Sequence, residues 1–223
     1  MSRKPLKAKH IPVETARRIP SQERAVQTMD TLFQAAAHIL EREGEAALTT
    51  NKVASVAGFS IGTLYQYFPS KEALIQAMGL RVQNQVLEQM EKYLNDLQAR
   101  EDLSKLDPYV LVRQALSLVV QSMTLKGKNK NLLRLFWMLE QPDQTTMASQ
   151  RMAETISIFF EQVKHPQIKK PTVTEVFVIT RSVLGFVRYA SLEKSSVLGS
   201  DAVEDVLAKM VFGILEHKIL IKQ

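Results

Sequence analysis

The chain has 223 residues, 45% of them hydrophobic, and a formal net charge of +6, which suits a globular protein with one large or two small domains and a polyanionic partner. It contains no cysteine, so disulfides, thiol catalysis and thiolate metal sites are excluded, and a reducing, cytoplasmic compartment is expected. No apolar run approaches the roughly 20 residues of a membrane-spanning helix, and the basic N-terminus lacks the apolar segment of a secretion signal.

Residues 1–20 are predicted to form a flexible basic arm, because they contain Pro5, Pro12 and Pro20 and few large apolar side chains. Residues 1–24 carry seven basic and two acidic side chains, a local charge of +5 (7 − 2) that makes up most of the chain's excess. Such an arm can follow the phosphates of a nucleic acid or enter a minor groove. A solvated tail is the alternative interpretation.

A first helix is predicted from Ser21 to Glu43, with Gly44 ending it. Its apolar residues keep the spacing of one buried stripe: Ala25, Met29, Leu32, Phe33, Ala36, Ile39 and Leu40. This helix is expected to pack behind the next two and complete a three-helix domain.

The stretch from Leu48 to Leu74 is predicted to form two short helices joined by a turn. Thr49 and Thr50 can cap the first helix, and Gly58 can end it in the left-handed conformation. Ser60 can cap the second helix, which runs from Ile61 to about Tyr67. Two short helices separated by a three- or four-residue turn with a glycine have the outline of a helix-turn-helix.

The second of these helices has one inward face and one hydrogen-bonding face. Leu64 and Phe68 are four residues apart and point inward together. The remaining surface is small or polar and has no acid: Ser60, Gly62, Thr63, Gln66 and Tyr67. Such a surface can enter the major groove of DNA, and Lys71 opens the next helix where a phosphate is favoured. A hairpin packed in a core, with merely solvated polar residues, is the alternative.

The motif in this stretch resembles the N-terminal domain of the TetR family of transcriptional regulators. The matching residues are Thr49-Thr50, Val53-Ala54, Ala57-Gly58, Gly62-Thr63-Leu64-Tyr65, Tyr67-Phe68 and Ser70-Lys71-Glu72-Ala73-Leu74. Their order and spacing match without a gap from about Ala25 to Leu74, and Arg17, Arg18, Pro20, Gln22 and Arg24 resemble a subset with a longer basic arm. The resemblance implies a DNA-binding domain over residues 21–70, a dimer and an effector pocket.

The DNA-binding surface is predicted from the same helices. The residues expected near base edges are Thr50, Asn51, Gly62, Thr63 and Gln66, and those expected near phosphates are Thr49, Tyr65, Tyr67 and Lys71. Ser60 belongs to the same surface, and Ile61 is expected to make an apolar contact such as one with a thymine methyl group.

Residues 71–223 are predicted to be a helical effector-binding and dimerisation domain, which makes the whole chain all-α with about nine helices. A long helix is expected from Lys71 to about Gln98, connecting the two domains as a candidate lever. Further helices are expected at residues 108–126 after the capping Asp107, at 132–140, and from about 143 onward.

The stretch 171–190 is rich in valine, a composition that favours strand, but its length and apolar spacing predict a helix. A last helix is predicted over residues 201–219 after a loop with Gly199. Both helices carry apolar residues on more than one face, so the same pair from a second subunit is expected to cover the outer face. A two-fold homodimer would read a palindromic operator on double-stranded DNA.

An effector pocket among the helices of residues 108–190 is the least specific prediction. Its candidate lining residues are large and apolar: Met123, Phe136, Trp137, Phe160, Phe186 and Tyr189. Plain core packing is the alternative for each of them. Arg134 and Arg181 are candidates to meet an acidic ligand group, with ion pairing or solvation as the alternative.

The function that these features favour is a sequence-specific DNA-binding transcriptional regulator, a repressor released by a small apolar or amphipathic effector. The alternatives are a helical protein-interaction module and a regulator without a small-molecule ligand. No enzyme, metal site or cofactor is expected, since the four histidines are scattered and no glycine-rich phosphate loop or serine elbow occurs.

Overall fold

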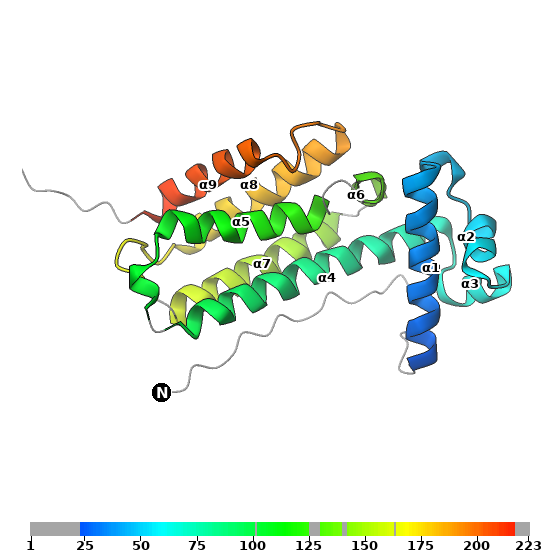
Figure 1. Ribbon diagram of the computed structural model, residues 1–223, viewed down its shortest axis with the longest axis horizontal. Coiled ribbons are helices and arrows are strands. Elements are labelled where there is room, and N and C mark those ends of the chain that lie inside the picture. The colour runs from blue at the N-terminus through cyan, green and yellow to red at the C-terminus, as the bar shows by residue number, and fades with distance from the viewer. Residues whose placement is uncertain (1–22, 101, 125–129, 140–141, 163, 217–223) are drawn as a thin grey trace, which may run out of the picture.

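The computed structural model describes residues 23–100, 102–124, 130–139, 142–162 and 164–216 (Figure 1). These residues form nine α-helices, two short 3-10 helices and two isolated β-bridges, so the predicted all-α class is confirmed. The predicted basic arm, Gly127 and the last residues predicted for the final helix lie outside the described residues.

The N-terminal helices are α1 (Glu23–Arg42), η1 (Glu45–Ala47), α2 (Thr50–Ala57) and α3 (Ile61–Tyr67). The buried residues of α1 are Leu32, Phe33, Ala35, Ala36, Ile39 and Leu40. All of them except Ala35 belong to the C-terminal part of the predicted stripe. Helix α1 packs on α2, and α2 packs on α3. Helix α1 therefore packs behind the helix-turn-helix and completes the expected arrangement of three helices.

Helix α4 (Lys71–Gln98) begins beside α3 and runs along the whole body of the molecule, with the predicted bounds. Its N-terminus is capped by Ser70, whose hydroxyl accepts the Ala73 N–H at 3.1 Å. Its buried stripe continues from Leu74 to Leu97. One rigid element thus belongs both to the N-terminal part and to the body.

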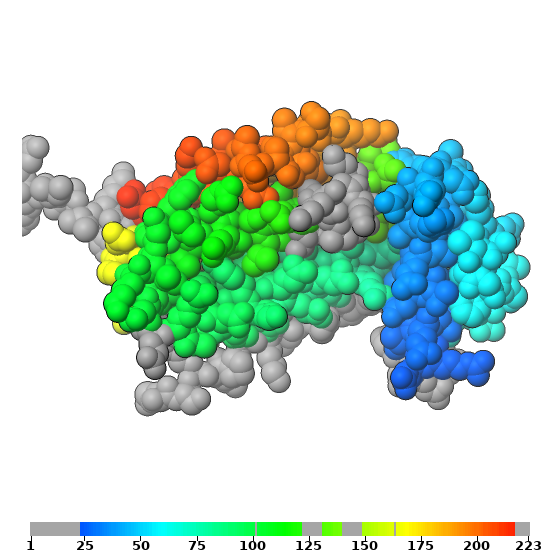
Figure 2. Space-filling model, viewed as in Figure 1, coloured from blue at the N-terminus to red at the C-terminus, as the bar shows by residue number. Residues whose placement is uncertain are grey.

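The body consists of α4 together with α5 (Pro108–Thr124), α6 (Lys130–Leu139), α7 (Pro142–Gln162), α8 (Val173–Leu192) and α9 (Asp201–Leu215), with η2 (Leu103–Lys105) between α4 and α5. Helix α5 packs between α4 and α9, α7 packs on α8, and α6 lies against both α4 and α8. Figure 2 shows α1 to α3 at one end of this elongated body.

The valine-rich stretch after Pro171 is helical, as predicted, and its first turn explains why. Thr172 and Glu175 form a capping box, in which the Thr172 hydroxyl accepts the Glu175 N–H and the Glu175 carboxylate accepts the Thr172 N–H. The Lys169 ammonium, 2.5 Å from Glu175, and this backbone N–H lower the pKa of Glu175 from 4.5 to about 2. Capping and charge therefore favour a helix start that valine content alone does not indicate.

Candidate DNA-binding helix and ligand cavity

Each predicted cap of the helix-turn-helix is present. The Thr49 hydroxyl accepts the Lys52 N–H at 3.2 Å, and the Ser60 hydroxyl accepts the Thr63 N–H at 3.0 Å. Gly58 ends α2 at φ 73°, a left-handed conformation that glycine adopts without strain. These three residues fix the turn that sets the direction of α3.

The inward face of α3 is fully buried. Leu64 and Phe68 have no exposed surface, and the Phe68 ring lies 5.5 Å from the ring of Phe33 on α1. Burial of side chains of this size stabilises the packed helix by about 2 kcal/mol each. The anchoring of this face leaves the opposite face of α3 directed away from the domain core.

The predicted DNA-binding residues all retain exposed surface. The exposed ones are Thr49, Asn51, Ser60, Ile61, Gly62, Tyr65 and Gln66, and the half-exposed ones are Thr50, Thr63, Tyr67 and Lys71. Ile61 and Tyr65 are 37% and 42% exposed, so both large side chains are accessible to a partner. The structure thus leaves each of these residues accessible on or beside α2, α3 and the start of α4.

Three contacts order these residues. The hydroxyls of Thr50 on α2 and Tyr65 on α3 lie 3.2 Å apart, and those of Ser60 and Thr63 lie 2.9 Å apart. The ring of Tyr67 packs on Phe68, with 6.4 Å between ring centroids. The exposed polar atoms are therefore held by local contacts, which lowers the entropy cost of binding a partner.

A cavity of about 130 Å³ lies inside the body, between α4, α5, α7, α8 and α9. Its walls are almost entirely aliphatic and aromatic, with Met90 and Leu94 from α4, Leu116 from α5 and Val183 from α8 among them. Tyr93 also lines it, and burial raises the pKa of this phenol to about 12. A cavity of this kind can hold a small apolar ligand.

The candidate pocket residues have different positions relative to this cavity. Phe160 lines it. Phe136 and Trp137 are buried outside the lining, Phe186 is half-buried outside it, and Tyr189 is 66% exposed on the surface of α8. The side chain of Met123 is outside the described residues. The α4 wall of the cavity was not predicted from the sequence, although Met90 and Leu94 belong to the apolar stripe that runs along this helix.

The two candidate arginines have partners within the protein. Arg134 on α6 pairs with both oxygens of Glu45 on η1, at 2.5 and 2.6 Å. Arg181 lies over the Phe177 ring, 4.4 Å from its centroid, and donates to the Thr180 hydroxyl. Neither arginine lines the cavity. The alternative of ion pairing describes Arg134, whereas Arg181 contacts a ring and a hydroxyl.

Two features are absent from the residues that the structure describes. Among those residues there is no group of three or more His, Asp or Glu side chains placed to hold a metal ion. No described helix is long and apolar enough to cross a membrane.

Comparison with known proteins places the N-terminal helices in a family. Residues 32–78 match the family model described as "Bacterial regulatory proteins, tetR family". Nucleoid occlusion factor SlmA of Aliivibrio fischeri is 34% identical over 68 residues, which are 30% of this chain and 35% of SlmA. The chain thus spans about a third of the length of the curated relatives that it matches.

Solved structures share the whole fold at low sequence identity. NalD of Pseudomonas aeruginosa, the secondary repressor of the MexAB-OprM multidrug efflux pump, has a TM-score of 0.56 at 17% identity, covering 87% of this chain and 99% of NalD. SmeT of Stenotrophomonas maltophilia, the repressor of the SmeDEF pump, has a TM-score of 0.59 at 16% identity, covering 88% and 94%. A SmeT–triclosan complex is also similar, with a TM-score of 0.61. The predicted architecture of a helix-turn-helix domain followed by a helical domain is thereby confirmed.

Proposed function

This chain belongs to the TetR family of transcriptional regulators, and from that premise we propose that it is a sequence-specific DNA-binding repressor released by a small-molecule effector. The observation that carries the proposal is the accessible polar surface of α3, fixed from behind by Leu64 and Phe68. A helix presented in this way fits the major groove of DNA. The cytoplasm is the proposed compartment.

The residues of this surface fall into two groups, those proposed to contact base edges and those proposed to contact phosphates. We assign contacts with base edges to Thr50, Asn51, Gly62, Thr63 and Gln66, with Ile61 against a thymine methyl group and Ser60 beside it. Thr49, Tyr65, Tyr67 and Lys71 are assigned to phosphates. Lys71 supports this assignment particularly, because it opens a helix of 28 residues whose first N–H groups also favour an anion.

The oligomer proposed is a two-fold homodimer formed by α8 and α9. Large apolar side chains are exposed on both helices, among them Phe177 (55%), Tyr189 (66%) and Val206 (65%). Covering such a surface with a second copy removes apolar area from water. A two-fold dimer would present two copies of α3, which suits a palindromic operator.

The effector site proposed is the cavity in the body. Helix α4 supports a link between effector and operator, because Met90 and Leu94 line the cavity while Lys71, at the other end of the same helix, lies beside α3. A ligand that favours a different position of α4 would change the spacing of the two α3 helices and weaken operator binding. The SmeT–triclosan complex supports small-molecule binding in this fold.

The DNA-binding assignment is tested by comparing variants on a selected operator and on unrelated duplexes. Lys71→Ala and Tyr67→Ala are expected to weaken binding to all sequences and to reduce its dependence on salt, because each removes a phosphate contact. Gln66→Ala is expected to change sequence preference instead. Lys92→Ala, an exposed lysine further along α4, is the matched control and should bind like the parent. Equal affinity of Lys71→Ala and the parent at moderate salt would contradict the phosphate role.

A further inference from the structure

The walls of the cavity lack formal charge. Of the lining residues that the structure describes, none is Asp, Glu, Lys or Arg, and the polar ones are Tyr93, His165 and Thr180. A charged ligand group would have no counter-ion in such a cavity, and burying an unpaired charge is very unfavourable. The chemistry of the ligand therefore depends on what the three polar side chains still offer.

The hydroxyls of Tyr93 and Thr180 already donate their protons to the backbone. The Tyr93 hydroxyl donates to the Leu111 carbonyl at 2.9 Å. The Thr180 hydroxyl donates to the Val176 carbonyl at 2.9 Å and accepts from Arg181 at 3.1 Å. Each hydroxyl has a single proton to donate, so neither provides a free donor for a ligand.

His165 is occupied at both ring nitrogens. Its Nδ1 lies 3.2 Å from the Gln167 N–H, and its Nε2 lies 3.2 Å from the Leu106 carbonyl oxygen. An N–H group only donates and a carbonyl oxygen only accepts, so Nδ1 is the acceptor and Nε2 carries the proton. His165 thus joins the segment after α7 to the segment before α5, with no ring nitrogen left for a ligand.

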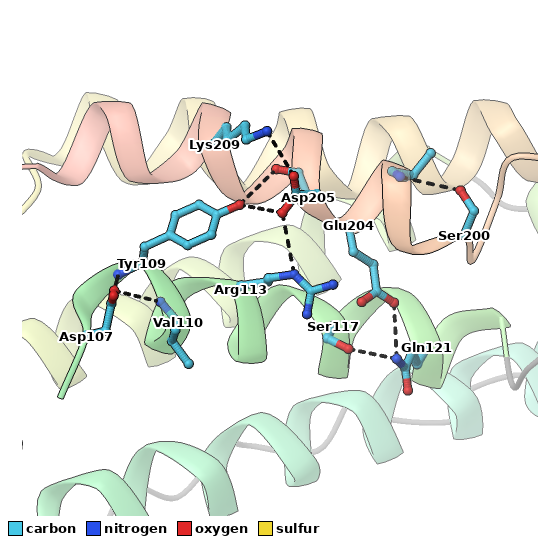
Figure 3. Close-up of polar contacts among 11 residues, drawn as sticks. Asp107, Tyr109, Val110, Arg113, Ser117, Gln121, Ser200, Glu204, Asp205 and Lys209 are labelled. Atoms are coloured by element: carbon cyan, nitrogen blue, oxygen red, sulfur yellow. Dashed lines mark hydrogen bonds and ion pairs between the residues drawn. The ribbon is translucent and has the colours of Figure 1, made fainter.

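The charged groups of α5 and α9 meet in the space between these two helices, as Figure 3 shows. Asp205 on α9 accepts from the Tyr109 hydroxyl at 2.6 Å and lies 3.6 Å from Arg113. The buried Glu204 carboxylate accepts from the Gln121 amide at 3.2 Å. The cavity side of α5 instead carries aliphatic side chains such as Val112 and Val119, so these charges are turned away from the ligand space.

We infer that the cavity binds an uncharged, apolar molecule about the size of a single aromatic ring, recognised by shape and hydrophobic contact, because its walls offer no free hydrogen-bond donor. An apolar cavity of roughly 150 Å³ binds benzene. This cavity is slightly smaller, at about 130 Å³, so its volume corresponds to about one aromatic ring. The inference rests on the proposed function only in identifying this molecule with the effector. It excludes the amphipathic, ionised effectors that the sequence left open.

The test uses three ligands of matched size on the full chain: ethylbenzene, benzylammonium and benzoate. Isothermal titration calorimetry gives each dissociation constant, and thermal unfolding gives the shift in Tm. Ethylbenzene is expected to bind and to raise Tm, and both ions to bind about 100-fold more weakly or worse, because each would lose its hydration without gaining a partner. Equal or tighter binding of either ion would overturn the inference, as would failure of saturating ethylbenzene to bind.

A pair of variants locates the binding. Ala115→Phe adds a ring at the cavity wall on α5 and is expected to abolish ethylbenzene binding, whereas Val110→Phe, at an exposed position of the same helix, should leave it unchanged. Equal ethylbenzene affinity of both variants would place the ligand elsewhere and overturn the inference. Leu184→Phe, at a half-exposed wall position, replaces Ala115→Phe if that variant unfolds. Operator binding is measured separately without ligand, so failure of the repressor proposal and failure of this inference are distinguishable.

Discussion

Gly79 on α4 lies directly against the ring of Phe136 on α6. A Cβ built on Gly79 would be 1.9 Å from the Phe136 Cδ2 atom and 2.2 Å from its Cγ atom, far inside van der Waals contact. Phe136 itself has no exposed surface. The absence of a side chain at position 79 is therefore what allows α6 to approach the backbone of α4.

Gly79→Ala is expected to destabilise the protein by about 1–3 kcal/mol, because the added methyl group must displace a buried ring. The direction of the change in free energy of unfolding is informative, because alanine inside a helix is otherwise more stable than glycine by about 1 kcal/mol. Urea unfolding followed by circular dichroism measures the change in free energy of unfolding.

Phe136→Leu provides the control for this prediction, because a smaller side chain makes room for the methyl group. In the Phe136→Leu variant, Gly79→Ala should lower the free energy of unfolding by less than it does in the parent. An equal cost in both backgrounds would show that the two residues do not determine each other's packing.

The ion pair between Arg134 and Glu45 joins α6 to the N-terminal helices. Its side chains are only 22% and 28% exposed, and the Arg134 Nη1 group donates to both carboxylate oxygens of Glu45. A double-mutant cycle with Arg134→Ala and Glu45→Ala is expected to give a coupling energy of about 1–2 kcal/mol in urea unfolding. If Arg134 is instead solvated, the two substitutions will be additive.

The pair between Lys52 and Glu43 is a matched control within the same part of the molecule. Its side chains are 37% and 45% exposed, so solvent screens the interaction more strongly. The corresponding cycle should give a coupling energy of about 0.5 kcal/mol or less. A larger coupling here than for Arg134 and Glu45 would contradict the ranking by burial.

The helix-turn-helix could be predicted from the sequence because its determinants are local. Thr49, Gly58 and Ser60 act on backbone groups within four residues, and the structure places all three as expected. Leu64 and Phe68 are four residues apart, and this spacing alone predicts that they lie on one buried face.

The contacts of the body could not be predicted in this way because they join residues far apart in the chain. Phe136 was a reasonable pocket candidate from its size, but Gly79 lies against its ring, a pairing across 57 positions (136 − 79) that no local pattern encodes. Tyr189 has the composition of a pocket residue and yet is 66% exposed. The spacing of apolar residues predicts which face of a helix a side chain lies on. Tertiary packing determines which residues that side chain contacts.

Stability in acid is expected to depend on Glu175. Its pKa of about 2 lies below the ordinary 4.5, so the unfolded chain binds this proton at a higher pH than the folded chain. The stabilisation is complete above about pH 4.5 and is lost as the pH falls toward about 2. Glu175→Gln should therefore lose less free energy of unfolding than the parent over this range, measured by urea unfolding at several pH values.

The matched control for this effect is Glu161→Gln. Glu161 is 62% exposed and lies 3.7 Å from Lys170, without a capping role. The free energy of unfolding of this variant should depend on pH as it does in the parent. A pH dependence weakened as much as in Glu175→Gln would contradict the assignment to Glu175.

The dimer proposal predicts that Val206→Glu gives a folded monomer. Val206 is 65% exposed on α9, so a charge there costs the single subunit little but would be buried in the dimer. Light scattering at micromolar concentration measures the mass, and circular dichroism checks the helix content. Val110→Glu, at an exposed position of α5, should remain dimeric. A parent protein that is strictly monomeric would contradict the proposal.

The most direct measurement is selection of bound fragments from a random duplex library at low ionic strength, with the parent protein and Gln66→Ala in parallel. If α3 reads the major groove from each half of a dimer, the parent will enrich a palindromic sequence, and Gln66→Ala will enrich one with altered bases in both halves. Recovery of no enriched sequence by the parent, or of an identical sequence by both proteins, would contradict that account of α3.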